Sequence, residues 1–182
     1  GLQADVCKTI VFVTHDIDEA IAMGDRIAIL AEGGVLQQLD TPAAILAYPA
    51  NGFVEEFLGA ERELRRLALI QVSEVRADRG PVVAPGATTA EAVKAAEAYG
   101  SDWVAIIADD GTILGWAYVT ALNGMVTQGD AQPFAATVMA EDSLRAALDV
   151  LVASPNGVAV RVGPDGRYAG LVTRPLVTEA LS

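Results

Sequence analysis

The sequence is poor in the residues from which covalent and metal sites are usually built. Its 182 residues include one cysteine, Cys7, and one histidine, His15. A single cysteine cannot form an internal disulfide, and one cysteine with one histidine cannot complete a structural zinc site. No metal site is therefore predicted. Catalysis by Cys7 would need an activating partner, so we interpret this residue as an unreactive thiol.

Basic residues are scarce as well. The chain has 12 Lys and Arg against 24 Asp and Glu, which gives a formal net charge of −12. Binding to nucleic-acid phosphates requires clustered basic residues, so the composition argues against a nucleic-acid partner, and it equally disfavours a polybasic patch for an anionic membrane surface. Because 52% of the residues are hydrophobic, the chain is not a disordered acidic tail. Its length allows one domain or two small ones.

A long apolar run is also absent. The longest uncharged segment, residues 111–129, is interrupted by glycines and polar residues, whereas a membrane-spanning helix needs about 20 mostly apolar residues. No basic-then-apolar signal opens the chain. We therefore expect a soluble, cytoplasmic protein. Gly1 stands where an initiator methionine would be, so we expect the chain to be a piece of a longer protein.

The first sixty residues have the pattern of the end of an α/β domain. Residues 9–14 (TIVFVT) are β-branched and apolar, as is typical of a strand that is buried on both faces. His15 follows this strand and precedes a helix N-terminus, which is where ligands bind in open α/β sheets. We interpret Asp16 as the cap of that helix. The other predicted elements are a helix, two strands joined by a Gly-Gly turn, and a second helix, over residues 18–23, 26–31, 35–39 and 43–47.

Two segments of this region resemble ATPase subunits of ABC transporters. Residues 11–20, VFVTHDIDEA, resemble the switch-histidine segment, and residues 33–59, GGVLQQLDTPAAILAYPANGFVEEFLG, are similar to the tail of the ATPase domain in importers. The resemblance implies that His15 contacts the γ-phosphate of ATP and helps to position the attacking water. A neutral imidazole can donate a hydrogen bond to a phosphate oxygen near pH 7.

The motifs that would hold ATP and its Mg²⁺ are missing from this sequence. A P-loop requires Gly-Lys-Ser/Thr, whereas the two lysines, Lys8 and Lys94, follow Cys7 and Val93. No LSGGQ-like signature occurs, and no acidic strand end of the Walker B type precedes His15. We therefore expect the chain to be inactive alone and catalysis to belong to a longer subunit, so whether this chain is an enzyme stays open.

The sequence from residue 82 onward repeats itself at an offset of 55 residues without a gap. Each copy predicts a short strand, a helix that opens at Thr88 or Ser143, two strands joined by an Asp-Gly turn, and a closing helix. Gly111 and Gly166 supply the positive φ of the turns. The paired strands are predicted over residues 103–108 and 113–118 in the first copy, and 158–162 and 168–173 in the second.

These β-α-β-β-α units resemble the CBS domain, here as a tandem pair. The resemblance is carried by VAIIADDGTILGWAYV (104–119) and VAVRVGPDGRYAGLVT (158–173). A duplicated ferredoxin-like unit is the alternative. The resemblance implies two clefts that take adenosine-containing ligands.

The family's usual ribose contact is an Asp three residues after a Thr at the end of the third strand. Thr173 is present in the second copy, but Leu176 holds the Asp position; Tyr118 and Ala121 occupy these places in the first copy. Binding of AMP or ATP in the usual mode is therefore in doubt. Thr173 and Arg174 remain candidate contacts to a hydroxyl or a phosphate, and a purely structural dimerising module is the alternative.

A short charged segment joins the two parts. Its three arginines, Arg62, Arg65 and Arg66, could meet an acidic partner, but a solvated connector helix with local pairing to Glu61 and Glu63 is the simpler interpretation. We predict the end of an ABC ATPase domain, a connector, a first CBS repeat and a second CBS repeat, over residues 1–59, 60–78, 79–131 and 132–182.

The predicted fold class is α/β: a C-terminal fragment of a P-loop ABC ATPase domain followed by a tandem CBS pair. This combination resembles the ATP-binding subunit of importers for quaternary amines such as glycine betaine, proline betaine, choline or carnitine. It implies ATP-driven uptake with ATP and Mg²⁺ bound in the complete subunit. The implied partners are a membrane permease and a second ATPase subunit at the inner face of the membrane, with dimerisation through the CBS pair.

The resemblance also implies that the CBS pair regulates uptake, in response to ionic strength, an adenine nucleotide or cyclic di-AMP. A second hypothesis is a stand-alone CBS module that senses a nucleotide or ionic strength without catalysis. A third is a non-functional truncation with exposed sheet edges.

Overall fold

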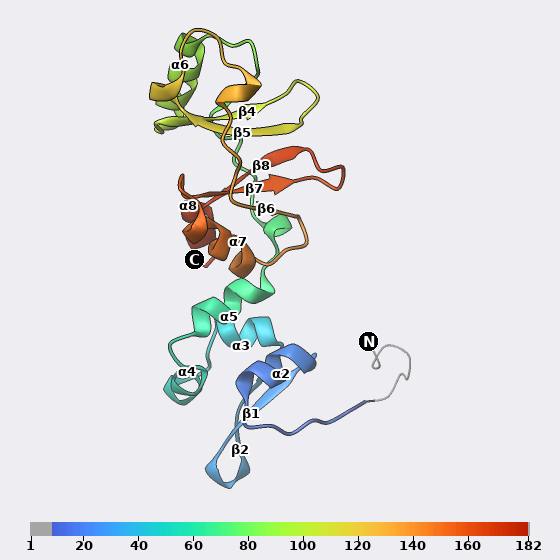
Figure 1. Cartoon of the computed structure of the whole chain (residues 1–182). Helices are drawn as coiled ribbons and strands as arrows, with labels where there is room; N and C mark the ends of the chain where they lie inside the picture. The colour runs from blue at the N-terminus through green and yellow to red at the C-terminus, as the bar shows by residue number, and fades with distance from the viewer. Residues whose placement is uncertain (1–8, 182) are drawn as a thin grey trace. The chain divides into compact units, whose positions relative to one another are not determined.

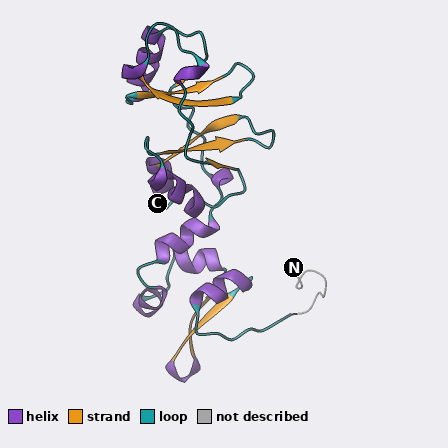
Figure 2. Cartoon of the chain, in the orientation of Figure 1, coloured by secondary structure: helices purple, strands orange, loops and turns teal. Residues whose placement is uncertain are grey.

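The chain divides into two compact units, and each has its own helices and strands (Figures 1 and 2). The computed structural model describes residues 9–181, so Cys7 lies outside the described residues. The first unit extends to Arg66 and the second begins at Leu67. Within residues 9–181, no helix has both the length and the apolar character that crossing a membrane requires.

The first unit is built around an antiparallel hairpin. Strand β1 (Ile27–Ala31) pairs with β2 (Val35–Asp40), as the sequence predicts. Between them Gly33 and Gly34 have φ angles of 77° and 79°, a conformation that side chains other than glycine adopt at a cost. The helices of this unit are α2 (Ile17–Met23), α3 (Pro42–Ala47), α4 (Gly52–Leu58) and the first part of α5 (Arg62–Leu69).

Side-chain caps explain where these helices begin. Asp16 Oδ1 accepts a hydrogen bond from the backbone N–H of Asp18 at 2.8 Å, which confirms Asp16 as the cap of α2. Thr41 caps α3 in the same way, and Asn51 caps α4. The helices and the hairpin enclose a small apolar core, formed by Ile27, Ile29, Ile45, Leu46, Val54 and Leu58.

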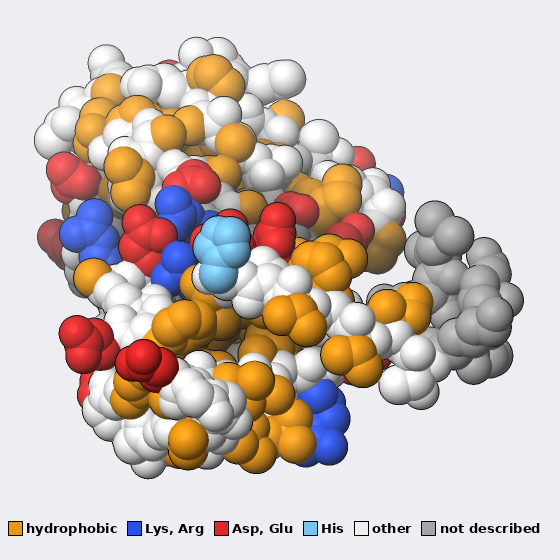
Figure 3. Space-filling model, turned by 90° about the horizontal axis from the view of Figure 1, so that it is seen from below, with side chains coloured by type: hydrophobic (Ala, Val, Ile, Leu, Met, Phe, Trp, Pro, Cys, Tyr) orange, Lys and Arg blue, Asp and Glu red, His pale blue; other side chains and the backbone are white. Residues whose placement is uncertain are grey.

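The predicted buried strand over residues 9–14 is wrong. This segment is extended but belongs to no strand, and Val11 and Val13 are 85% and 89% exposed. A strand that is buried on both faces needs neighbouring strands and a layer on each side, whereas β1 and β2 pair only with each other among the described residues. Figure 3 shows hydrophobic side chains at the surface of the face that it displays.

The second unit contains two three-stranded sheets of identical topology. In each, a short parallel strand and a longer antiparallel strand flank a central strand. The first sheet is formed by β3 (Val82–Val83), β4 (Trp103–Ile107) and β5 (Ile113–Tyr118), and the second by β6 (Thr137–Val138), β7 (Val158–Val162) and β8 (Tyr168–Thr173). The helices are α6 (Thr89–Tyr99), α7 (Leu144–Ala153) and α8 (Arg174–Glu179), with short 3-10 helices at Val72–Glu74, Val119–Ala121 and Gln128–Asp130.

The predicted offset between the two repeats is confirmed, because corresponding strands begin 55 residues apart. Gly111 and Gly166 have φ angles of 85° and 76° in their turns, which confirms their predicted role. The predicted closing helix of the first repeat is wrong, because two short 3-10 helices, Val119–Ala121 and Gln128–Asp130, follow β5, and the described residues between β5 and β6 contain no α-helix. In the first repeat, Gly124 has a φ of 83°, which is not a helical conformation. In the second repeat, Pro175 lies in the first turn of α8, where proline favours a helix.

The central strands are buried on both faces, which explains why they do not alternate between apolar and polar residues. In β4, Val104 and Ile106 pack in a cluster with α6, while Ala105 and Ile107 pack in a cluster with β7. The two sheets therefore face each other and share an apolar core. Helix α6 lies outside one sheet, and α7 and α8 lie outside the other (Figure 1).

Each sheet also receives a residue from the segment that precedes the other repeat. Asp78 forms a bridge with Leu171 in β8, and Gln132 forms the equivalent bridge with Trp116 in β5. At Gly115, an added Cβ would lie 2.2 Å from the Gln132 carbonyl oxygen. This glycine is required because the crossing backbone approaches too closely for any side chain.

Part of the predicted connector belongs to the second unit. Val72 is fully buried in a cluster with Leu144 and Val172, and the Val72 N–H donates to the Asp142 carbonyl at 2.8 Å. The Arg161 guanidinium donates to the carbonyl oxygens of Val72 and Val75 at 3.3 and 3.4 Å. Residues 70–75 are therefore packed against the second repeat instead of forming a solvated linker.

Candidate functional site

The first candidate site is the loop that carries His15. The His15 side chain is exposed and lies between the extended segment 9–14 and helix α2. Its neighbours on both sides are bonded to the first turn of α2: Asp16 caps the helix, and the Thr14 hydroxyl donates to Glu19 Oε2 at 2.7 Å. The loop therefore presents an accessible imidazole from a backbone that is held to a helix.

The arginines of α5 form the local ion pairs that the sequence predicts. Arg62 and Arg66 lie 2.8 and 2.9 Å from Glu63, and Arg65 lies 3.5 Å from Glu61. Arg65 also makes a long-range pair, 2.6 Å from Asp18, that the sequence does not reveal. Hydrogen bonding to Arg65 lowers the pKa of Asp18, whose side chain is 64% exposed.

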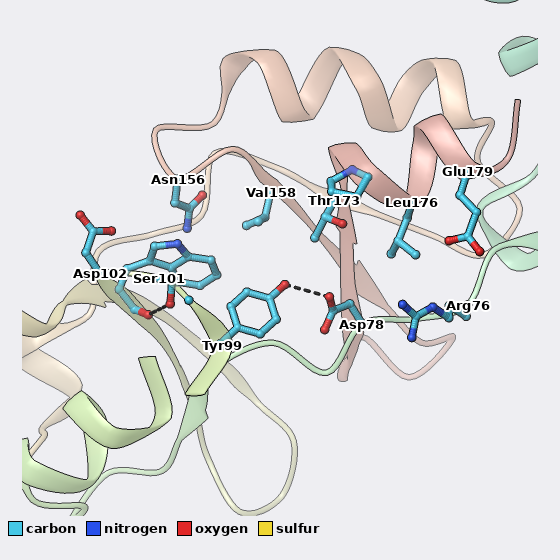
Figure 4. Close-up of a pocket in the computed structure, with 13 residues that line it drawn as sticks. Arg76, Asp78, Tyr99, Ser101, Asp102, Asn156, Val158, Thr173, Leu176 and Glu179 are labelled. Atoms are coloured by element: carbon cyan, nitrogen blue, oxygen red, sulfur yellow. Dashed lines mark hydrogen bonds between the residues drawn. The ribbon is translucent and has the colours of Figure 1, made fainter. Parts of the chain in front are cut away.

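The second candidate site is a cleft of about 770 Å³ in the second unit (Figure 4). One side is formed by the end of α6 and the start of β4, and the other by the α7–β7 loop, the end of β8 and α8. The segment before β3 lies at one end. The residues that line the cleft are Arg76, Asp78, Tyr99, Gly100, Ser101, Asp102, Trp103, Asn156, Val158, Thr173, Pro175, Leu176 and Glu179.

The structure separates the two residues that the sequence proposes for this cleft. Thr173 lines it, and its hydroxyl makes no capping bond to α8. Arg174 is exposed on the first turn of α8 and does not line the cleft. Leu176 is 4% exposed and forms part of the wall. The cleft wall is therefore apolar at the position where, by the resemblance, a CBS domain usually has its ribose-binding carboxylate.

Sequence reasoning missed the central polar contact of the cleft. The Tyr99 hydroxyl donates to Asp78 Oδ2 at 2.9 Å (Figure 4), and the Gly80 N–H donates to Asp78 Oδ1 at the same distance. Burial and then the Asp78 carboxylate raise the pKa of Tyr99. Burial, with Tyr99 and Asp78 nearby, also raises the pKa of Tyr168. Asp78 lies outside both predicted repeats; the only local signal was the Asp-x-Gly spacing of a turn.

One polar group in the cleft wall has an unused hydrogen-bonding capacity. Among the described residues, the buried Asn156 Nδ2 has no hydrogen-bond partner, whereas Asn156 Oδ1 accepts from the Ser154 hydroxyl at 2.5 Å. A buried donor without a partner costs about 1–3 kcal/mol. An acceptor atom placed beside Asn156 would remove this cost.

The charged residues of the cleft are mostly acidic. Asp78, Asp102 and Glu179 line it together with one cation, Arg76. Each additional phosphate charge about 8 Å from a carboxylate costs roughly 1 kcal/mol at an effective dielectric constant of about 40. The lining therefore favours a ligand with few negative charges over a polyphosphate. No group of three or more residues suited to holding a metal ion occurs in residues 9–181.

The first repeat does not reproduce the arrangement around Thr173. Its counterpart is Tyr118, whose ring packs edge-on against Trp116 with centroids 4.9 Å apart and planes at 83°. An aromatic ring thus replaces the threonine hydroxyl.

Known proteins match both units. The osmoprotectant import ATP-binding protein OsmV of Salmonella typhimurium is 35% identical over 184 residues, covering 100% of this chain and 48% of the relative. The glycine betaine/carnitine/choline transport ATP-binding protein OpuCA of Bacillus subtilis is 48% identical over 94 residues, covering 51% of this chain and 24% of the relative. The chain thus spans about half the length of OsmV, and its match to OpuCA spans about a quarter of that relative. No protein-family model matches.

Solved structures match more than half of the chain. The CBS-pair protein CBSX2 from Arabidopsis thaliana has a TM-score of 0.54 at 20% identity, covering 61% of this chain and 93% of that chain. The CBS domain of the bacterial CNNM/CorC family Mg²⁺ transporter, in complex with ATP, has a TM-score of 0.53 at 20% identity, covering 65% and 92%. These likenesses confirm the predicted CBS-pair fold. The chain is therefore a homologue of the ATP-binding subunits of osmoprotectant ABC importers and contains a CBS pair.

Proposed function

We propose that this chain is the C-terminal part of an ATP-hydrolysing importer subunit, in which residues 1–59 complete the ATPase domain and the CBS pair regulates it. The observation that carries this proposal is the 35% identity to an osmoprotectant import ATP-binding protein over the whole chain. A stand-alone sensing module would leave the similarity of the first unit unexplained. The cargo is a quaternary amine such as glycine betaine, carnitine or choline, as the names of the relatives suggest.

In the complete subunit, His15 acts at the γ-phosphate of ATP bound with Mg²⁺. The exposed imidazole and its helix-anchored loop suit this role, because phosphoryl transfer depends on positioning and charge stabilisation. His15 donates a hydrogen bond to a phosphate oxygen and orients the attacking water. The phosphate-binding motifs belong to the rest of the subunit.

The subunit works with a membrane permease and a second ATPase subunit at the inner face of the membrane. The CBS pair contributes a dimer contact. Uptake of labelled glycine betaine by the complete importer in proteoliposomes tests the proposal. We expect ATP-dependent uptake that His15→Ala abolishes; uptake that persists in this variant would contradict the role of His15, and transport of unrelated solutes alone would contradict the cargo class.

The cleft of the CBS pair takes a regulatory adenine ligand. The supporting features are the Thr173 hydroxyl, the unused Asn156 donor and the volume of about 770 Å³. CBSX2 has been solved in complex with AMP. Because carboxylates dominate the lining, we expect AMP or cyclic di-AMP to bind more tightly than ATP.

Calorimetry of this chain with AMP, ATP and cyclic di-AMP tests the ligand. Thr173→Val should weaken binding, whereas Arg174→Gln, whose side chain lies outside the cleft, should have little effect. If none of the three ligands binds, ionic strength or dimerisation becomes the regulatory function of the pair.

A further inference from the structure

We propose that Arg65 is a positioning residue for His15 and that it acts through Asp18 in the first turn of α2. This inference rests on the proposed function, because it concerns the same ATP-hydrolysing site. All three residues belong to the first unit.

The contact between Arg65 and Asp18 has a defined geometry. Arg65 Nε donates to Asp18 Oδ1 at 2.6 Å, and Nη2 donates to Oδ2 at 3.1 Å. The third guanidinium nitrogen, Nη1, donates to the Leu58 carbonyl at 2.9 Å, at the end of α4. The Arg65 side chain is 17% exposed, which is low for an arginine. A fork that is held at both ends fixes the orientation of Asp18 more firmly than a single exposed ion pair would.

A short series of hydrogen bonds links Asp18 to the residues on either side of His15. The backbone N–H of Asp18 donates to Asp16 Oδ1 at 2.8 Å, and the Asp16 N–H donates to Thr14 Oγ1 at 3.0 Å. The Thr14 hydroxyl in turn donates to Glu19 Oε2 at 2.7 Å, in the same turn of α2. The residues on both sides of His15 are thus hydrogen-bonded to the first turn of α2, and Arg65 binds Asp18 in that same turn.

Helix α5 contains residues of both units, because Arg65 belongs to the first unit and Leu67 is buried in a core of the second. Because the Asp18 side of this pair is largely exposed, we expect substitution of Arg65 to change the geometry of the His15 loop more than the stability of the first unit.

Helix α5 supplies a matched control. Arg62 carries the same charge on the same helix, and its ion pair is with Glu63, 2.8 Å away on α5 itself. Arg62→Gln removes a charge and a local pair without touching the contact to α2.

The kinetic test uses the complete subunit. Arg65→Gln should lower kcat for ATP by about tenfold and leave KM within about twofold, because a small misplacement of a reacting group is costly while nucleotide binding is retained. Asp18→Asn should have the same effect, Arg65→Lys a smaller one, and Arg62→Gln almost none. Equal activities of Arg65→Gln and Arg62→Gln, or an effect on KM alone, would overturn the proposal.

A second readout needs no catalysis and uses this chain. His15 is the only histidine, so its imidazole NMR signals are unambiguous. Arg65→Gln, but not Arg62→Gln, should increase the fast motion of this ring and accelerate amide exchange at Asp18–Ala20 by about tenfold. Unchanged ring motion and exchange would refute the positioning role. If the wild-type complete subunit hydrolyses no ATP, the proposed function fails, and the NMR comparison still decides the role of Arg65.

Discussion

The two units bury their apolar residues in different ways. In the second unit, each sheet is covered by the other sheet on one face and by helices on the opposite face, so its central strands have no exposed apolar side. Among residues 9–66 of the first unit, only six are buried in its core. Many large apolar side chains remain at the surface, among them Val11, Phe12, Val13, Leu30, Val35 and Leu36.

The same sequence pattern, a run of apolar residues, is therefore buried in the second unit but exposed over residues 9–14 of the first. The apolar runs of the second unit form strands that pair with other strands of the same unit. The run over residues 9–14 pairs with no strand among the described residues. A large exposed apolar surface on a folded protein usually marks a place where another surface binds. We therefore expect the second unit to be the more autonomous folding unit.

The largest loss of stability should come from adding a side chain at Gly115 in β5, where the backbone of Gln132 lies close. At Gly115→Ala the new Cβ would meet the Gln132 carbonyl oxygen, so we expect a loss of about 3 kcal/mol or more in the unfolding free energy of the second unit. Gly157→Ala is the control, because its φ of 67° is unfavourable but nothing lies within 4 Å; it should cost about 1 kcal/mol. Equal losses in urea unfolding would contradict the close approach.

The next largest effect should come from cavities that are created by alanine substitutions in the core of each unit. Leu144 and Ile45 are both fully buried, in the second and first unit respectively. Alanine at either position should cost about 2–5 kcal/mol. Hydrogen exchange should show that each substitution lowers protection only within its own unit. Loss of protection throughout residues 9–181 after either substitution would show that the units unfold as one.

An effect of alkaline pH is expected in the second unit. The pKa values of Tyr99 and Tyr168 are raised above the ordinary tyrosine value of about 10. The folded state therefore keeps these hydroxyls protonated when the unfolded state has lost the protons, so stability is complete below pH 10 and falls as the pH rises above it. Tyr99→Phe should make the unfolding free energy less dependent on pH between about 10 and 12. An unchanged slope would mean that Tyr99 ionises normally.

The smallest effect concerns the first unit. Asp16→Ala removes the cap of α2 and should cost about 1 kcal/mol in the unfolding free energy of this unit. Asp16→Asn keeps an acceptor and should cost much less. Chemical denaturation followed by circular dichroism measures both variants, and identical losses would show that the cap bond does not stabilise α2.

Local signals in the sequence were sufficient where the partners lie close together along the chain. The Asp-Gly turns at Gly111 and Gly166 fix the hairpins, so the strands 113–118, 158–162 and 168–173 have the predicted bounds. The caps Thr88 and Ser143 mark the helix starts for the same reason. These features depend on backbone conformation within a few residues.

Contacts between distant segments could not be predicted in this way. Asp78 reaches Tyr99 in the cleft because its segment pairs with Leu171 in the other repeat, and no local pattern encodes that crossing. The pair of Arg65 with Asp18 spans 47 residues for a similar reason. Leu176 could be read as a missing carboxylate, but its place in the cleft wall required the fold.

The central claim is that the first unit contributes a catalytic histidine to an ATPase, and ATP turnover by the complete subunit with and without His15→Ala tests it most directly. Nucleotide affinity measured in parallel separates binding from hydrolysis. We predict that kcat falls by about a hundredfold or more while ATP still binds. A turnover rate within twofold of the wild type would contradict the assignment of His15 and, with it, the catalytic role of the first unit.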